Sequence, residues 1–274
     1  MSTPSGQPVL RFDGVTVSFG DETALADVSF EAFEGESRII LGAASSGKTV
    51  LLKAALGLVR PVSGRVYAFG RDITAMRERG LFEIRSKIGM LFQESALFDS
   101  LTVEENVAYP LVNQKSICCP EENVRPRVVQ ALDFVELGET LEKFPSELSG
   151  GMRRRAAIAR AVVTEPPLML YDSPTAGLDP ITAHTIMALI IKERDVAHAT
   201  TLMVTHRYQD GALMAKFRYN PKLGGLEAAQ NGSRKDLRTV FMVLREGRLV
   251  FEGSQEQLES CGDPYALHFV KQRT

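Results

Sequence analysis

The sequence predicts an α/β protein: a parallel sheet with crossover helices forms a core, an antiparallel β part precedes it, and a helical subdomain interrupts it. Three observations lead to this fold class. Short apolar runs alternate with helical patterns, which is typical of strand–helix–strand units. A glycine-rich loop follows one such run and precedes a helix. Between residues 93 and 159 the pattern is mostly helical.

The first 92 residues are expected to supply the antiparallel part and the first core strands. Alternating apolar and polar residues predict strands at 9–19 and 26–33, after a polar tail at residues 1–8. Shorter runs predict strands at 37–41, 64–69 and 88–92, and a helix at 48–57.

Helical spacing at 121–137 and a helix start near Ser149 place the helical subdomain at 93–159. Further strands are expected at 168–171, 201–204 and 241–244, with a helix at 180–194. The chain is therefore expected to hold one domain over 9–274, whose core comprises 9–92 and 160–274.

Composition restricts the classes of partner. The 274 residues carry a net charge of −2, which favours no nucleic-acid partner. Three cysteines form neither a disulfide framework nor a zinc pattern. The polar start has no apolar signal core, and no uncharged run approaches the roughly 20 residues of a membrane helix. Any membrane role is therefore expected to depend on a partner protein.

Residues 42–49 match the pattern G-x-x-x-x-G-K-T in the strand–loop–helix context that this motif requires. Backbone N–H groups and the helix N-terminus attract phosphate, while a lysine adds charge and a threonine offers a hydroxyl to Mg²⁺. The sequence therefore predicts ATP and Mg²⁺ as cofactors of a RecA-like P-loop core. The predicted nucleotide-binding residues here are Gly42, Ser45, Ser46, Gly47, Lys48 and Thr49.

A second motif, at 168–172, is an apolar strand that ends in Asp172. Alone it fits an ordinary turn aspartate equally well. Together with the phosphate loop it predicts that Asp172 holds Mg²⁺ alongside Thr49.

A third motif is the run Ser149, Gly150 and Gly151 at the start of a predicted helix. One interpretation is a serine cap with a flexible approach. The other is that this helix N-terminus meets the γ-phosphate of an ATP molecule held by a second subunit.

In this order and spacing, the motifs resemble those of ABC transporter ATP-binding subunits, over about residues 9–272. The resemblance implies that Phe19 stacks on adenine, although a strand-end core aromatic is the alternative. It implies that Gln93 senses the γ-phosphate, contacts Mg²⁺ and meets the transmembrane partner. It also implies that His206 is the switch histidine, and that Asp179 contacts the opposite subunit.

The segments 93–111, 151–156, 178–182 and 262–265 are similar to the Mla, or Mce-associated, phospholipid-trafficking ATPases. This similarity implies lipid transport across a bacterial envelope. It also implies a transmembrane permease, a possible MCE-domain protein and a place on the cytoplasmic face of the inner membrane. The alternatives are another ABC importer or exporter, a soluble ABC protein, and a nucleotide-gated regulatory subunit.

Ser173 departs from the family pattern, which has a glutamate at this position to activate the attacking water. Loss of a general base typically costs roughly 10²–10⁴-fold in rate. Three interpretations stay open. Serine is tolerated because Gln93 and His206 suffice, the chain is a slow, binding-driven motor, or it pairs with a second ATPase that keeps the glutamate. A homodimer and a heterodimer are therefore both expected possibilities.

Two other features depart from the expected course. Residues 216–239 form an insertion rich in turn signals, expected to be an exposed loop or hairpin, with docking of a partner as the alternative. The arginines at 153–155 are expected to form a solvated face. Approach of one of them to nucleotide or to a partner loop is left open.

Overall fold

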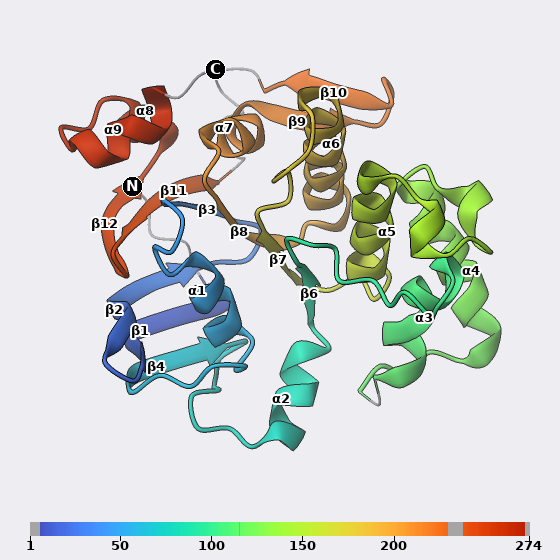
Figure 1. The fold of residues 1–274 in the computed structure, drawn as a ribbon, viewed down its shortest axis with the longest axis horizontal. Coiled ribbons are helices and arrows are strands. Elements are labelled where there is room, and N and C mark those ends of the chain that lie inside the picture. The colour runs from blue at the N-terminus through green and yellow to red at the C-terminus, as the bar shows by residue number, and fades with distance from the viewer. Residues whose placement is uncertain (1–5, 115, 230–237, 272–274) are drawn as a thin grey trace.

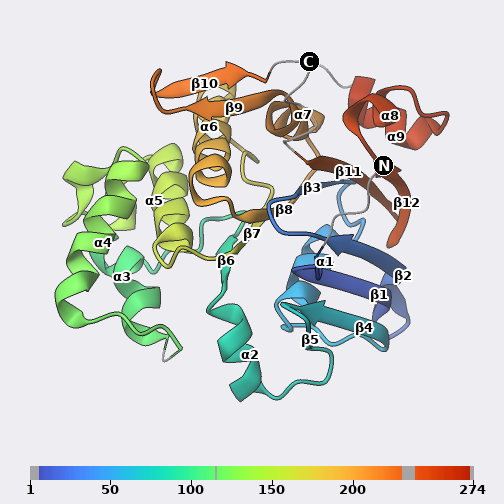
Figure 2. The same cartoon turned by 180° about the vertical axis from the view of Figure 1, so that it is seen from behind.

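A computed structural model describes residues 6–114, 116–229 and 238–271. A central sheet separates two parts of the molecule, and Figures 1 and 2 show them on opposite sides of it. An antiparallel sheet with α1 occupies one side. The helices of the interrupting subdomain occupy the other. This arrangement confirms the predicted fold class.

The central sheet has six strands in the order β12-β11-β3-β8-β7-β6. All neighbouring pairs are parallel except β11 with β12, so five strands end at one edge of the sheet. The strands are β3 (Ser37–Leu41), β6 (Ile88–Leu91), β7 (Leu168–Asp172), β8 (Thr200–Thr205), β11 (Thr239–Arg245) and β12 (Arg248–Gly253).

The antiparallel sheet has the order β2-β1-β4-β5. Its strands are β1 (Leu10–Phe19), β2 (Glu22–Ala32), β4 (Ser63–Ala68) and β5 (Arg71–Asp72). The second strand begins earlier than the alternation predicts. Asp27 has φ 56°, and the register between β1 and β2 shifts near Val15 and Val17, so an irregular pairing conceals the first residues of β2.

The helices cover both faces of the central sheet. On the phosphate-loop side lie α1 (Lys48–Ala55) and α2 (Glu78–Arg85). The subdomain contains α3 (Val103–Asn113), α4 (Glu121–Phe134), α5 (Gly150–Val162) and short 3₁₀ helices at Gly138–Thr140 and Pro145–Glu147. The remaining helices are α6 (Pro180–Ala197), α7 (Tyr208–Lys216), α8 (Gln255–Glu259) and α9 (Pro264–Lys271).

Strand side chains alternate between two apolar clusters. Ile39 and Leu41 of β3 pack with the helical side, while Ile40 packs with the antiparallel sheet and α1. The period of 2 along a strand places successive side chains on opposite faces. Because both faces are covered, the core strands are apolar throughout, which explains why they appear as short continuous runs in the sequence.

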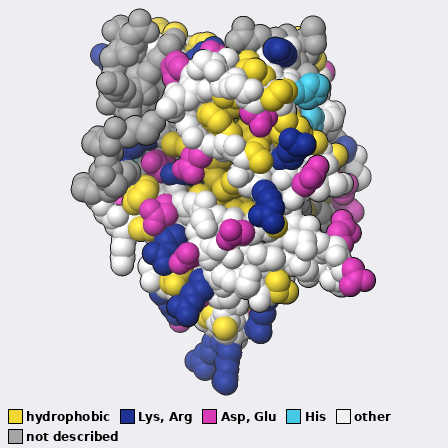
Figure 3. Space-filling view, turned by 90° about the vertical axis from the view of Figure 1, so that its left-hand side faces the viewer, with side chains coloured by type: hydrophobic (Ala, Val, Ile, Leu, Met, Phe, Trp, Pro, Cys, Tyr) yellow, Lys and Arg dark blue, Asp and Glu magenta, His cyan; other side chains and the backbone are white. Residues whose placement is uncertain are grey.

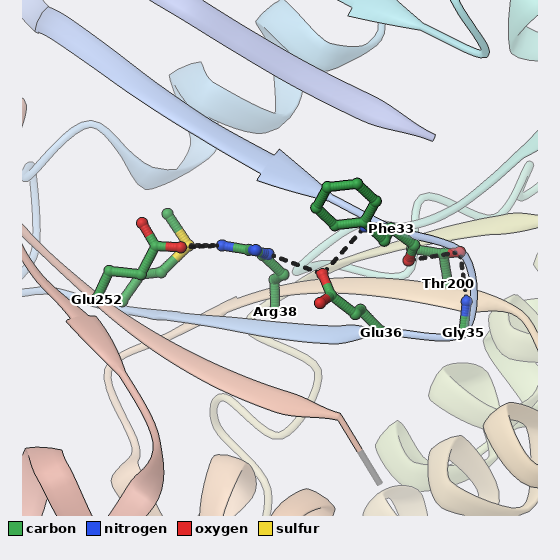
Figure 4. Close-up of polar contacts among 7 residues, drawn as sticks. Phe33, Gly35, Glu36, Arg38, Thr200 and Glu252 are labelled. Carbon is green, nitrogen blue, oxygen red and sulfur yellow. Dashed lines mark hydrogen bonds and ion pairs between the residues drawn. The ribbon is translucent and has the colours of Figure 1, made fainter. Parts of the chain in front are cut away.

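A buried ion-pair network joins the turn before β3 to the edge strand β12 (Figure 4). Arg38, 5% exposed, contacts Glu36 through Nε at 3.3 Å and Glu252 through Nη1 at 2.5 Å. The same Glu36 carboxylate accepts a hydrogen bond from the Phe33 N–H, and the Thr200 hydroxyl accepts one from the Gly35 N–H. The network therefore fixes the chain where it passes from one sheet to the other.

The insertion at 216–239 contains a hairpin, as one interpretation predicted, in its described part. Strands β9 (Phe217–Asn220) and β10 (Gly225–Ala228) pair beside α6, and residues 230–237 lie outside the described ranges (Figure 1). Arg194 of α6 donates to the Phe217 carbonyl at 2.8 Å, and Asp195 accepts from the Tyr219 N–H at 2.7 Å. The hairpin is thus half-buried rather than exposed over most of its length.

The face shown in Figure 3 mixes acidic and basic side chains around an apolar group in its upper half. The described helices include none with the length and apolar character needed to span a bilayer.

Candidate functional site

The predicted site residues gather where the parallel strands end. Leu41 at the end of β3 pairs with Thr205 of β8, and Val204 of β8 pairs with Asp172 of β7. Crevices outside the carboxyl ends of such strands are where ligands bind in open α/β sheets. The three strand ends bring the phosphate loop, Asp172 and His206 to one edge.

The phosphate loop wraps around the N-terminus of α1. Gly47 has φ 101°, and a Cβ on it would lie 2.3 Å from the Ala24 carbonyl oxygen. A Cβ on Gly42 would lie 2.4 Å from Ser46 Oγ. Both positions therefore require glycine for the loop to close. Among the described residues no side chain caps α1, so its first N–H groups remain available to an anion.

Lys48 lies inside this loop. Its Nζ donates to the carbonyl oxygens of Gly42 at 2.8 Å and Ala43 at 2.6 Å. Burial lowers the pKa of Lys48, and the negative charge of Asp172 opposes that shift. The ammonium group is held within the loop, where the phosphates of a nucleotide would lie.

Thr49 and Asp172 meet although 123 residues separate them. Thr49 Oγ1 donates to Asp172 Oδ2 at 2.8 Å, and Asp172 is 4% exposed. A hydroxyl and a carboxylate are the oxygen ligands that Mg²⁺ takes beside substrate phosphates. The donor set fits Mg²⁺, although no cluster of three His, Cys, Asp or Glu side chains occurs in the described part of the chain.

Ser173 occupies the position where the resemblance implies a glutamate. It is 6% exposed and adopts φ 47°, with its N–H bound to the Val204 carbonyl at 2.8 Å. Its hydroxyl donates to Asp172 Oδ1 at 3.2 Å. The side chain is therefore directed to the carboxylate that fits Mg²⁺, and it offers no group that takes a proton at neutral pH.

Asp210 was missed in the sequence. It is 1% exposed and accepts hydrogen bonds from Thr175 Oγ1 at 2.7 Å and Thr205 Oγ1 at 2.9 Å. It thus joins the turn after Ser173 to the end of β8, directly before His206. Burial raises the pKa of Asp210, while the two hydroxyls and nearby cationic groups oppose the shift. The available signal was an acidic residue in the first turn of the helix after His206.

His206 and Gln93 are both exposed at this edge. Gln93 lies two residues after the end of β6, and the preceding residue, Phe92, lines a groove of about 280 Å³. Phe98 and Tyr109 stand in its wall with ring centroids 4.6 Å apart. Both rings remain about two-fifths exposed, at 41% and 40%.

Asn106 and Arg160 fix the groove's shape. Asn106 Oδ1 accepts from the Phe98 N–H at 2.8 Å, and its Nδ2 donates to the Phe98 carbonyl at 3.0 Å. Arg160 donates to the Ala96 and Ser95 carbonyls at 2.8 and 2.9 Å. These hydrogen bonds therefore hold the loop after Gln93, in which Leu97 packs against the core while Phe98 stays exposed.

Ser149 caps α5, because its hydroxyl accepts from the Met152 N–H at 3.2 Å. Gly151 packs closely, since a Cβ there would lie 2.7 Å from Thr182 Cγ2, whereas one on Gly150 would meet nothing within 4 Å. Among the described residues no hydrogen bond or ion pair links 149–151 to 42–49. The serine cap is thus present. The other predicted role, contact with the γ-phosphate of an ATP molecule, would require a second subunit.

Asp179 caps α6 by accepting from the N–H groups of Ile181 and Thr182, both at 3.0 Å. These hydrogen bonds, foremost those with Thr182, lower the pKa of Asp179. The adjacent Ile181 is 81% exposed, an apolar side chain that a partner could cover. Phe19, 54% exposed at the end of β1, is no core aromatic and is free to stack on a base.

The prediction of a solvated face at 153–155 is wrong for its middle residue. Arg154 is 5% exposed, and burial lowers its pKa, with Asp172 opposing the shift. Its guanidinium donates to the carbonyls of Phe92 and Ala176, and its charge interacts with Asp172.

Comparison with known proteins gives one family. The ABC transporter family profile matches residues 25–176. The probable ribonucleotide transport ATP-binding protein mkl of Mycobacterium leprae is 40% identical over 72% of this chain and 56% of its own length. The chain thus spans little more than half of that relative.

The intermembrane phospholipid transport system ATP-binding protein MlaF of Haemophilus influenzae is 31% identical over 97% of this chain and 91% of its own length. Among solved structures, a dimeric post-hydrolysis state of the ATP-binding cassette MJ0796 with ADP and Pi is similar. It has a TM-score of 0.72 and 29% identity, over 89% of this chain and 98% of that one.

Proposed function

We propose a function for this chain, which belongs to the ABC transporter family: it binds and hydrolyses ATP to power phospholipid or other lipid transport across the bacterial envelope. The main observation in support of ATP hydrolysis is the 2.8 Å contact between Thr49 Oγ1 and Asp172 Oδ2 beside the phosphate loop. The similarity to MlaF supports the lipid cargo, because it extends over 97% of the chain.

Nucleotide binding follows from groups of this chain. The N–H groups of the loop and of α1 surround the phosphates, and Lys48 exchanges two loop carbonyls for phosphate oxygens. Mg²⁺ held by Thr49, Asp172 and Gln93 would neutralise charge on the transferring phosphoryl group. Gln93 and His206 orient the attacking water, and Ser173 makes turnover slow because it takes no proton.

Two subunits close head to tail around ATP, as homodimer or as heterodimer with a second ATPase. Ser149 of each subunit then approaches the nucleotide of the other, and the exposed Ile181 is covered. Light scattering with Mg-ATP tests this. The parent chain should dimerise and Ser149→Arg should not, while Ser146→Arg, an exposed position before the same helix, is the control. A dimer of the Ser149 variant as stable as the parent's would contradict the arrangement.

The groove beside Gln93 receives a helix of a transmembrane permease, which places the chain on the cytoplasmic face of the inner membrane. Phe98 and Tyr109 offer the apolar contact, and the groove adjoins the nucleotide sensor. Cysteines at Phe98 should cross-link to a co-expressed permease, whereas one at Val196, 55% exposed on α6, should not. Failure at Phe98 and at Tyr109 would argue for a role without a permease.

A second candidate is an importer ATPase for another cargo. It is favoured by the 40% identity to mkl and to a Rhodococcus jostii methionine import protein, MetN 2. The reconstituted permease complex discriminates the two. Phospholipid, with an MCE-domain protein present, should raise its ATP turnover, whereas stimulation only by methionine or ribonucleotide would favour the second candidate.

A further inference from the structure

The three arginines at 153–155 of α5 make different contacts. Arg153 donates to the Leu148 carbonyl at 2.7 Å, and Arg155 donates to the Val135 carbonyl at 3.0 Å. Both acceptors belong to the helical subdomain at 93–159. Arg154 alone of the three is buried, at 5% exposure.

Arg154 bridges two loops that belong to different strands. Its Nη1 donates to the Phe92 carbonyl at 2.8 Å, and its Nη2 donates to the Ala176 carbonyl at 3.5 Å. Phe92 directly precedes Gln93, at the end of β6. Ala176 begins the turn that ends at Asp179, after β7. One planar guanidinium therefore contacts the loop of the nucleotide sensor and the turn toward the other subunit.

The charge of this guanidinium also bears on the site. Asp172 is close enough to offset part of the desolvation of Arg154. Its Nε, buried as well, has no acceptor among the described residues. A side chain that leaves a donor unsatisfied contributes less to stability than one that satisfies all of them. Its geometry instead suits the positioning of the two carbonyls it holds.

We propose that Arg154 is a positioning residue that couples the Gln93 loop to the Asp179 turn within one subunit. Since both carbonyls bind one rigid fork, displacement of either loop either moves the other or breaks a charge-assisted hydrogen bond. Neither neighbour on the helix can replace it, because Arg153 and Arg155 already bind carbonyls elsewhere. The inference rests on the ATP hydrolysis proposed above, but on neither cargo nor permease.

A double-mutant cycle on the full chain tests this coupling. Steady-state kcat and KM for ATP are measured for Arg154→Gln, Gln93→Ala, the double variant and the control Arg155→Gln. ATP-dependent dimerisation is recorded for the same set. We expect Arg154→Gln to lower kcat at least about tenfold, the size of one hydrogen bond to a charged group. KM should stay within about twofold, because the phosphate loop is untouched.

The coupling itself appears as non-additivity. If Arg154 acts through the Gln93 loop, Gln93→Ala should cost less than about twofold when Arg154→Gln is already present. Arg154→Lys, which keeps the charge without the fork, should restore only part of kcat. If Arg154→Gln does not fold, Arg154→Lys replaces it in the double-mutant cycle.

Three outcomes overturn the inference. They are fully multiplicative losses, an effect of Arg155→Gln as large as that of Arg154→Gln, or full rescue by Arg154→Lys. If parental turnover is too slow to measure, the cycle is scored on dimerisation, where the same non-additivity is expected. A parent that neither hydrolyses ATP nor dimerises with it overturns the proposed function and this inference together.

Discussion

The phosphate loop and the Asp172–Ser173 turn lie on either side of β8, at the same edge of the same sheet. The loop has every group that phosphate binding needs, from the two close-packed glycines to Lys48. The turn has Asp172, the carboxylate proposed to hold Mg²⁺, but it also has a serine whose hydroxyl donates to that carboxylate. We therefore expect ATP binding and ATP hydrolysis to be separable in this chain, since the residues proposed for them lie at different strand ends.

The largest expected effect falls on the Arg38 ion-pair network, which joins the turn before β3 to β12. Arg38→Met leaves the Glu36 carboxylate buried and unpaired, which should lower the free energy of unfolding by about 3–5 kcal/mol. Urea denaturation measures it. Adding Glu36→Gln removes the unpaired charge and should recover much of the loss. The ATP affinity of the folded fraction should not change, and a parallel loss of affinity would show that the ion-pair network and the nucleotide site are coupled.

The next largest effect concerns the phosphate loop. Lys48→Ala removes the ammonium group from the loop and should weaken ATP binding on the order of a hundredfold with the fold retained. A fluorescent ATP analogue reports the affinity. Lys53→Ala, an exposed lysine in the last turn of the same helix, is the matched control. Equal affinities for the two variants would rule out the phosphate-loop assignment.

A smaller effect concerns Glu193 of α6, which contacts β7 through Tyr171. Glu193 is 3% exposed and accepts from Tyr171 OH at 3.4 Å, and burial raises the pKa of Glu193 to about 7. The folded state therefore binds this proton more tightly than the unfolded state. Stability should therefore fall as pH rises from about 4.5 through 7, by about 3 kcal/mol in all.

Glu193→Gln should flatten this pH dependence, measured by urea denaturation at pH 5 and pH 8. ATP affinity should not change, because the residue lies behind β7 and away from the phosphate loop. An unchanged slope with pH would show that Glu193 titrates as it does in the unfolded chain.

The sequence was sufficient for the phosphate loop, because its spacing and its strand–loop–helix context are local. It was insufficient where side chains meet across the fold. Arg154 belongs to a run that the sequence predicts to be solvated, whereas in the fold it is buried and donates to the carbonyls of Phe92 and Ala176, which lie far from it in the sequence. The hairpin after α7 looked exposed because its partners, Arg194 and Asp195, belong to an earlier helix. The capping box of α8, Ser254 with Gln257, was visible in the sequence but was missed.

Ser173→Glu tests the separation of binding from hydrolysis most directly. The measurement is steady-state ATP turnover of the assembled permease complex, with ATP affinity determined on the same preparation. Ser173→Gln is the matched control, since it has nearly the same volume without a base. We predict that glutamate raises turnover at least about tenfold, that glutamine does not, and that affinity holds in both. Unchanged or lower turnover with glutamate, at constant affinity, would contradict the account and assign the attacking water to other groups, His206 first.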